Sequence, residues 1–140
     1  MNVSVDYKGG MEFHGIDDKN FSIIMDAENK NIGGKDKGPA PKKVFLMGLA
    51  GCTAMDVVFI LRKMKIELDD FKINVDTELL EDHPKEFKTI HLTYIFTGKD
   101  LDERKVKKAV ELSQTKYCSL STMLKKVVQS FTYEYKIINS

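Results

Sequence analysis

The sequence predicts an α+β fold, in which short strands and one long apolar helix occupy separate stretches of the chain. Four segments alternate apolar and polar side chains, which is typical of strands with one buried face. A fifth segment, residues 44–61, is apolar almost without interruption and is too long for a strand. Strands grouped before and after a long helix favour this class over a regularly alternating parallel sheet. The alternating segments are 3–7, 71–79, 87–96 and 130–138.

Length and composition indicate one globular domain, residues 1–140. Hydrophobic residues make up 42% of the chain and charged residues 31%, as in ordinary folded proteins. The 22 basic and 21 acidic residues give a net charge of +1, so no overall field favours an anionic partner. We therefore expect no nucleic-acid partner.

The first ten residues lack the basic and apolar regions of a secretory signal, so we expect a cytoplasmic protein. In a reducing compartment two cysteines are either packing residues or reactive thiols. Three scattered histidines, His14, His83 and His91, do not form a zinc pattern with them. The sequence thus predicts neither a metal site nor a cofactor.

The N-terminal residues predict a meander of three short strands over 1–26. Gly9-Gly10 and the polar cluster 17–20 provide its two turns. Residues 27–40 are polar and rich in glycine and proline, which predicts a surface loop.

A long central helix is predicted over residues 41–65, with Pro41 at its first position. Its apolar part, 44–61, reaches the lower limit of a membrane-spanning helix. Thr53 and Asp56 lie inside that part, and a central aspartate costs about 2.5–3.5 kcal/mol in a membrane. We therefore expect a buried core helix and no membrane partner.

The same helix predicts a homodimer. It is apolar nearly all round, and a chain of 140 residues can hardly enclose such a helix alone. Several of its residues are small enough for another backbone to approach closely. These are Gly48, Ala50, Gly51 and Ala54.

The C-terminal half predicts an antiparallel hairpin, two helical pieces and a closing strand. The hairpin covers 69–98, with a polar turn at 81–85. Asp100 followed by Glu103 matches a capping box and predicts a helix start. The helical pieces and the last strand are expected at 101–128 and 130–138.

Two cysteines are the candidate reactive residues. Cys52 lies in the middle of the apolar helix, in GLAGCTAMD. Cys118 lies in KYCSLSTML, where one helical piece ends and the next begins, and a helix N-terminus stabilises a thiolate. Taken alone, each cysteine also fits an inert packing residue, because free cysteine is often buried.

The segment PKKVFLMGLAGC, with the apolar helix after it, resembles the first cysteine motif of the OsmC/Ohr family. The segment YCSLS resembles the second, which in typical members reads Cys-Pro-x-Ser. The predicted order of elements matches this family along nearly the whole chain. The chain is therefore identified as a member of the OsmC/Ohr family.

The resemblance implies antiparallel sheets wrapped around a long central buried helix, in an intertwined homodimer. It also implies a thiol peroxidase of organic hydroperoxides, with Cys52 as the peroxidatic thiol and Cys118 as the resolving one. A small dithiol or a thioredoxin-like protein would reduce the resulting disulfide, and no metal or organic cofactor is implied.

The sequence departs from the most active members at three positions. Met11 stands where they carry an arginine, Lys42 where they carry its glutamate partner, and Ser119 in place of the proline. Ser121 keeps the later serine of the motif. These residues place the chain in the OsmC-like branch.

Without that arginine, another cation must lower the pKa of Cys52. Asp56 follows Cys52 by one helical turn, where its charge raises the thiol pKa unless it positions a cation. The candidate cations are Lys42, Lys43, Arg62 and His14 of the partner subunit.

Two other functions fit the same fold. One is a dimer that binds an apolar ligand without peroxide turnover, and the other is a structural dimer with inert cysteines.

Overall fold

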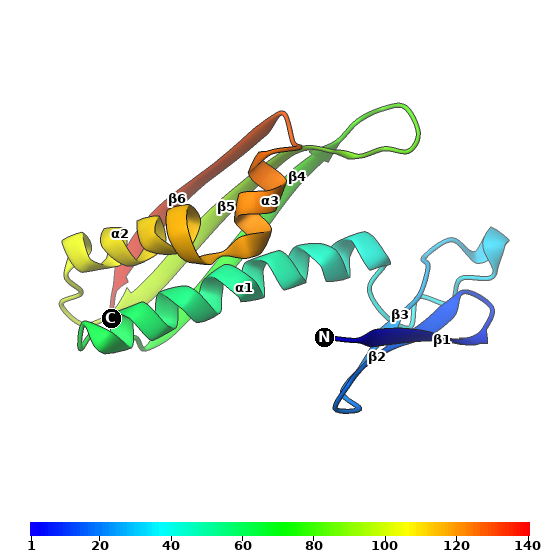
Figure 1. Cartoon of the computed structure of the whole chain (residues 1–140), viewed down its shortest axis with the longest axis horizontal. Coiled ribbons are helices and arrows are strands. Elements are labelled where there is room, and N and C mark those ends of the chain that lie inside the picture. The colour runs from blue at the N-terminus through cyan, green and yellow to red at the C-terminus, as the bar shows by residue number, and fades with distance from the viewer. The chain divides into compact units, whose positions relative to one another are not determined.

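The computed structural model describes all 140 residues as two compact units, Met1–Met47 and Gly48–Ser140. Both units contain a three-stranded sheet, and the helices cluster in the second (Figure 1). The predicted α+β class is confirmed. The assignment of residues 1–140 to a single domain stays a prediction.

The first unit contains the predicted three-stranded meander. Its strands pair antiparallel in the order β1-β2-β3. Gly9 at the end of β1 and Gly10 in the first turn have φ of 106° and 57°, a left-handed backbone that glycine adopts without a Cβ clash. The strands are β1 Val3–Gly9, β2 Glu12–Asp17 and β3 Ser22–Met25, and a 3₁₀ turn follows at Lys30–Ile32.

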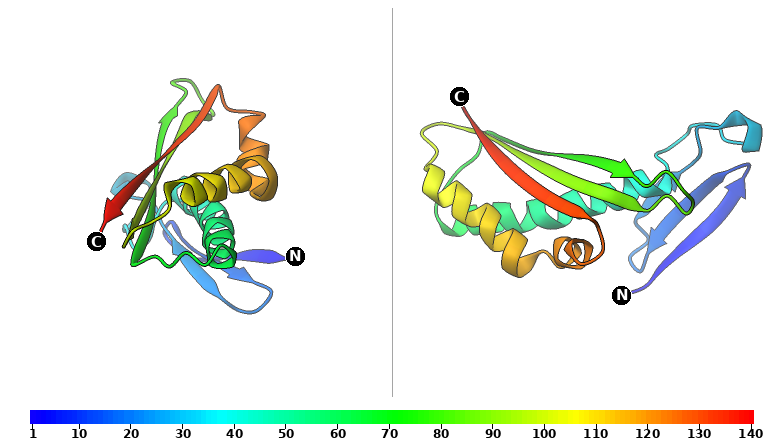
Figure 2. Two further views of the ribbon diagram at one scale, coloured as in Figure 1. Left: turned by 90° about the vertical axis from the view of Figure 1, so that its left-hand side faces the viewer. Right: turned by 90° about the horizontal axis from the view of Figure 1, so that it is seen from above.

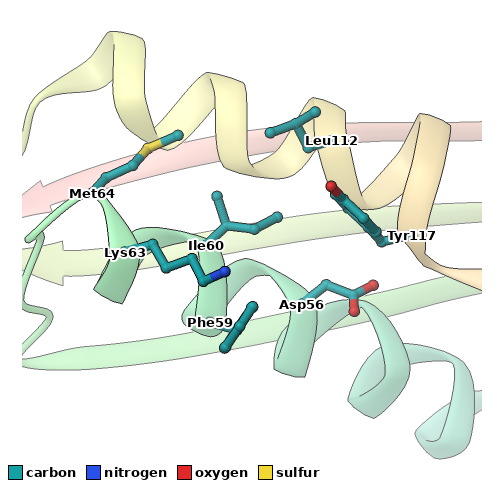
Figure 3. A pocket seen from close by; sticks show the side chains of 7 residues that line it. All are labelled: Asp56, Phe59, Ile60, Lys63, Met64, Leu112 and Tyr117. Atoms are coloured by element: carbon teal, nitrogen blue, oxygen red, sulfur yellow. The ribbon is translucent and has the colours of Figure 1, made fainter.

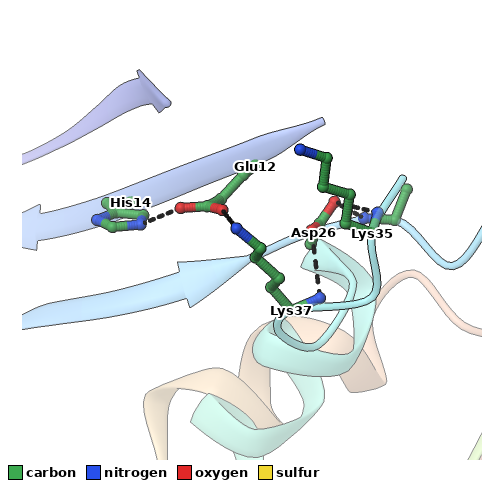
Figure 4. Close-up of polar contacts among 6 residues, drawn as sticks. Glu12, His14, Asp26, Lys35 and Lys37 are labelled. Atoms are coloured by element: carbon green, nitrogen blue, oxygen red, sulfur yellow. Dashed lines mark hydrogen bonds and ion pairs between the residues drawn. The ribbon is translucent and has the colours of Figure 1, made fainter. Parts of the chain in front are cut away.

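The loop after β3 is held by Asp26, which is 3% exposed. Its carboxylate accepts backbone N–H groups of Ala27, Lys35 and Lys37 at 2.7, 3.4 and 3.2 Å. Figure 4 shows the Asp26 carboxylate with its dashed contacts to Lys35 and Lys37. Burial raises the pKa of Asp26, but the three N–H groups outweigh it and hold the pKa below its ordinary value.

Helix α1 spans Pro41–Lys63, two residues shorter than predicted. Its length and composition would allow it to cross a membrane, but the core helix of a soluble protein meets the same two criteria. One stripe at four-residue spacing is buried, whereas Met55 and Phe59 are 77% and 59% exposed. Enclosure of α1 on most sides is therefore not observed within one chain. The buried stripe is Leu49, Thr53, Val57 and Leu61.

The second sheet has the order β4-β5-β6 and is mixed, which corrects the prediction of antiparallel sheets. Strands β4 and β5 form the predicted antiparallel hairpin, but β6 lies parallel to β5, with Tyr135 opposite Tyr94. Two helices connect β5 to β6 and return the chain to the start of β5, so both strands run the same way. The strands are β4 Asp70–Leu79, β5 Phe87–Gly98 and β6 Ser130–Asn139.

The connection consists of α2 Glu103–Leu112, a π-helical turn Ser113–Tyr117 and α3 Ser119–Lys125. The N-cap of α2 is Asp102, so the predicted capping box from Asp100 is wrong. The Asp102 carboxylate accepts the N–H groups of Arg104 and Lys105. Asp100 has φ of 50°, whereas an N-cap residue needs an extended backbone.

The core of the second unit lies between the sheet and its helices. Figure 2 shows α1 and α2 on the same face of the sheet. Buried side chains of β5, including Tyr94 and Phe96, meet those of the helices. Phe96 stacks on Phe71 of β4 with ring centroids 4.6 Å apart. This packing fixes α1 and the α2–α3 connection, the two segments that carry the cysteines.

Candidate functional site

The structure brings Cys52 and Cys118 together. Their Sγ atoms lie 3.2 Å apart, close enough for one thiol to donate a hydrogen bond to the other. Both are free thiols; Cys118 is 0% exposed and Cys52 is partly exposed. A disulfide has an S–S distance of about 2.0 Å, so a small movement would join them.

The first turn of α3 provides one backbone N–H group to each sulfur. Cys118 is the N-cap of this helix, and its sulfur accepts the N–H of Ser121 at 3.4 Å. The N–H of Leu120 interacts with the sulfur of Cys52. Helix α3 has seven residues, so these individual hydrogen bonds matter more than a helix dipole.

Within this chain the pKa of Cys52 is raised, which is opposite to the expected lowering. Burial raises it most, and the neighbouring Cys118 and the charge of Asp56 raise it further. The N–H of Leu120 acts in the other direction but does not outweigh them. Asp56 therefore raises the pKa of the Cys52 thiol, as expected. No cation of this chain lowers that pKa.

Two of the four candidate cations from the sequence are engaged or placed elsewhere in this chain. Lys43 forms an ion pair with Glu28 at 2.9 Å. Arg62 lies ten positions after Cys52 on α1, about 15 Å along the axis. His14 and Lys42 belong to the unit Met1–Met47, and their part in the site stays a prediction.

Sequence reasoning missed Lys125, the last residue of α3. Its ammonium donates a hydrogen bond to the backbone carbonyl of Gln114 at 2.5 Å. Burial lowers the pKa of Lys125, while electrostatic attraction to Cys118 raises it. The spacing was a usable signal, because residues seven apart lie on the same face of a helix.

A buried chain of hydrogen bonds lies beside the cysteine pair. Thr53, the residue after Cys52, has its hydroxyl 2.6 Å from the hydroxyl of Tyr94 and 2.7 Å from that of Ser113. Ser113 donates to Asp56 at 3.1 Å. The side-chain amide of Gln114 donates to the Tyr94 hydroxyl at 2.6 Å.

This chain of hydrogen bonds ties together the segments that carry the two thiols. Thr53 belongs to α1, and Ser113 and Gln114 belong to the π-helical turn before Cys118. Such π-helical turns often occur at functional sites. Two buried oxygens nearby in sequence have no hydrogen-bond partner, namely Gln114 Oε1 and Ser121 Oγ.

Tyr94→Phe is expected to lower the free energy of unfolding by about 1–3 kcal/mol. The change removes a buried hydroxyl, so Gln114 and Thr53 each lose one hydrogen bond in an apolar interior. Chemical denaturation followed by circular dichroism measures the loss.

Tyr135→Phe is the matched control. Its hydroxyl donates to Glu103 of α2 at 3.1 Å in a solvent-exposed hydrogen bond, although its ring packs against the core. We expect a change below about 0.5 kcal/mol there. Equal losses in the two variants would contradict a stabilising role for the buried network.

A cavity of about 540 Å³ opens next to the cysteine-bearing segments. Asp56, one turn after Cys52, and Tyr117, next to Cys118, lie near one end of it, and Lys63 and Met64 lie nearer the other (Figure 3). The remaining lining is apolar and comes from Phe59, Ile60 and Leu112. No group of three or more His, Cys, Asp and Glu side chains is placed to hold a metal ion.

Comparison with known proteins identifies the family. The model of the OsmC-like proteins matches residues 34–131, which include both cysteines. The chain belongs to the OsmC-like family. Protein YhfA of Escherichia coli is 38% identical over 138 residues, which cover 99% of this chain and 98% of YhfA.

Solved structures support the OsmC-like fold. A hypothetical protein from Aquifex aeolicus is 28% identical, with a TM-score of 0.80 over 98% of this chain and 96% of the other. The organic hydroperoxide resistance protein OhrB of Bacillus subtilis has a TM-score of 0.63 at 24% identity, over 97% and 98% of the two chains. At that level of identity the likeness to OhrB concerns the fold alone.

Proposed function

We propose that this OsmC-like protein reduces organic hydroperoxides by a dithiol/disulfide cycle, with Cys52 as the peroxidatic thiol and Cys118 as the resolving thiol. The observation that carries the proposal is the 3.2 Å separation between the sulfurs of a partly exposed cysteine and a buried one. The partly exposed cysteine suits the reaction with peroxide, and the short distance supports a second step between the two sulfurs. The same-fold protein OhrB is named for organic hydroperoxide resistance.

In the first step the Cys52 thiolate attacks one oxygen of the hydroperoxide. The O–O bond breaks, the alcohol leaves with a proton, and Cys52 becomes a sulfenic acid. Cys118 donates a hydrogen bond to the Cys52 sulfur at 3.2 Å in the reduced pair, and the proton that Cys52 loses balances the one that leaves with the alcohol.

In the second step the Cys118 sulfur attacks the Cys52 sulfur. The S–O bond breaks, the hydroxyl group leaves as water, and a disulfide forms. The two thiols have then given two electrons to the peroxide. An external dithiol or a thioredoxin-like protein restores both thiols by exchange.

One equivalent of cumene hydroperoxide is expected to convert most of the protein to an intramolecular Cys52–Cys118 disulfide. The sulfurs need to approach by little more than about 1 Å, so the second step should be faster than further oxidation of Cys52. Peptide mass spectrometry after rapid alkylation measures the linked and free forms.

Cys118→Ser is the control for this experiment and should accumulate sulfenic and then sulfinic acid on Cys52. Sulfinic acid on Cys52 in the wild type, with Cys118 still free, would show that Cys118 does not act as the resolving thiol.

The cavity beside Asp56 and Tyr117 favours a second candidate, a dimer that binds an apolar ligand without turnover. The two candidates differ in one measurement. Competition between cumene hydroperoxide and an apolar fluorescent probe, without formation of the disulfide, would favour ligand binding over peroxide reduction.

A further inference from the structure

The two sulfurs of the site differ in access and in surroundings. Cys118 is 0% exposed, whereas Cys52 is partly exposed. An external thiol that reduces a disulfide between them must therefore meet the Cys52 sulfur. Exchange then breaks the S–S bond and releases the other sulfur, Cys118, as a thiolate.

The surroundings of Cys118 suit a leaving thiolate. The N–H of Ser121 donates to its sulfur at 3.4 Å. Lys125 follows two turns later on the same helix, and a 2.5 Å hydrogen bond to the carbonyl of Gln114 holds its ammonium against the turn that precedes Cys118. A cation near a thiolate stabilises it, and a leaving group that is a more stable thiolate departs faster.

The place of Lys125 is fixed by more than this one hydrogen bond. Its ammonium also lies over the rings of Phe131 and Tyr133 on β6, at 5.4 and 5.9 Å from their centroids. Partial burial of the ammonium lowers the Lys125 pKa, and the attraction of Cys118 opposes that lowering. Partial removal from water strengthens a charge interaction of this kind.

We propose that Lys125 is a positioning residue that stabilises the Cys118 thiolate, so that Cys118 is the leaving sulfur when an external thiol attacks Cys52. The proposal rests on the proposed disulfide cycle. It deepens that cycle by naming the sulfur that the reductant must reach, and by assigning a cation in a branch that lacks the arginine at Met11.

In the balanced step, a reductant thiolate forms a mixed disulfide with the Cys52 sulfur and the Cys52–Cys118 bond breaks. Cys118 is released as a thiolate and therefore has the negative charge. A second reductant thiol then attacks the reductant sulfur of the mixed disulfide, which releases the Cys52 thiolate and leaves the reductant oxidised to its disulfide. The charge on Cys118 persists between the two exchanges, and Lys125 acts there.

Other titratable groups around the sulfur pair come from each element packed against it, so the test must separate Lys125 from them. A substitution of Lys125 leaves the other titratable side chains unchanged. These groups are Asp56 on α1 and Tyr94 on β5, and the next group out is Tyr133 on β6, which acts on Tyr94.

The test compares the reduction potential of the disulfide in full-length wild type, Lys125→Met, Lys125→Arg and the adjacent control Lys126→Met. Each protein is equilibrated with dithiothreitol redox buffers at an alkaline pH and at a mildly acidic pH. Lys125→Gln replaces Lys125→Met if the latter does not fold. No peroxide is used, so the result is independent of whether the protein turns over hydroperoxides.

At alkaline pH, Lys125→Met is expected to favour the disulfide about three- to tenfold, and tenfold corresponds to roughly 30 mV. At acidic pH, where both thiols keep their protons, the difference should vanish. Lys125→Arg and Lys126→Met should match the wild type. A brief reaction of the disulfide with glutathione should place the mixed disulfide on Cys52. Equal potentials at alkaline pH, a shift that is the same at both pH values, or glutathione on Cys118 would overturn the proposal.

Discussion

Cys52→Ser is expected to lower the turnover of tert-butyl and cumene hydroperoxide by at least about a hundredfold, because a serine hydroxyl does not attack a peroxide at neutral pH. Cys118→Ser should keep the first reaction with peroxide, since Cys52 is the partly exposed cysteine of the pair. Its steady turnover should fall less, because a small dithiol can reduce the sulfenic acid directly. The rate of hydroperoxide consumption in the presence of dithiothreitol gives the turnover of the wild type and of the two variants.

The wild-type rate should be modest at neutral pH and should rise with pH. The pKa of Cys52 is raised by burial, by Cys118 and by Asp56, so only a small fraction is thiolate at neutral pH. As the pH increases toward that raised pKa, the thiolate fraction and the rate increase together. Asp56→Asn removes one of the raising charges and should shift this profile to lower pH.

The opposite assignment of roles has a distinct outcome. Pulse alkylation at graded pH, read by peptide mass, orders the two thiols. If Cys118 were modified well below the pH at which Cys52 reacts, and Cys118→Ser alone abolished peroxide consumption, Cys118 would be the peroxidatic thiol.

Strand positions could be predicted from the sequence, but the direction of β6 could not. Alternation along 71–79 and 87–96 reflects which face of a strand is buried, which is a local property. The same alternation occurs in parallel and antiparallel strands. The direction of β6 depends on how α2 and α3 return the chain across the sheet. The residues 130–138 do not determine that connection, so their pattern cannot predict the direction.

The site was predictable in part for a similar reason. The resemblance to a known family singled out Cys52 and Cys118 before any geometry was available. Lys125 stands seven residues after Cys118 in the sequence, and this spacing alone does not bring the two side chains together. Its relation to Cys118 arises when α3 forms and its ammonium reaches the carbonyl of Gln114. Thr53 is visible in the sequence as a polar residue inside the apolar segment, whereas the burial of Gln114 is seen only in the structure.

Gly48→Leu is expected to weaken a homodimer of this chain about 5- to 150-fold in Kd, which corresponds to about 1–3 kcal/mol. Met55 and Phe59 leave a large apolar surface of α1 exposed in a single chain. A Cβ built on Gly48 or Gly51 meets no atom within 4 Å. Because this face of α1 is apolar and has open space at its glycines, we expect a second copy of the chain to pack against it.

This substitution separates the dimer from the fold of the chain, because it should affect the two in opposite directions. Within one chain leucine has room at position 48 and is a better helix former than glycine, by up to about 1 kcal/mol. In the dimer the added side chain would push the partner away. Gly48→Ala is the matched control, since it improves the helix with little added volume and should leave the dimer intact. Sedimentation at micromolar concentration measures the association. A stable folded monomer of the wild type, or an unchanged Kd in Gly48→Leu, would show that α1 does not pair with another copy through this face.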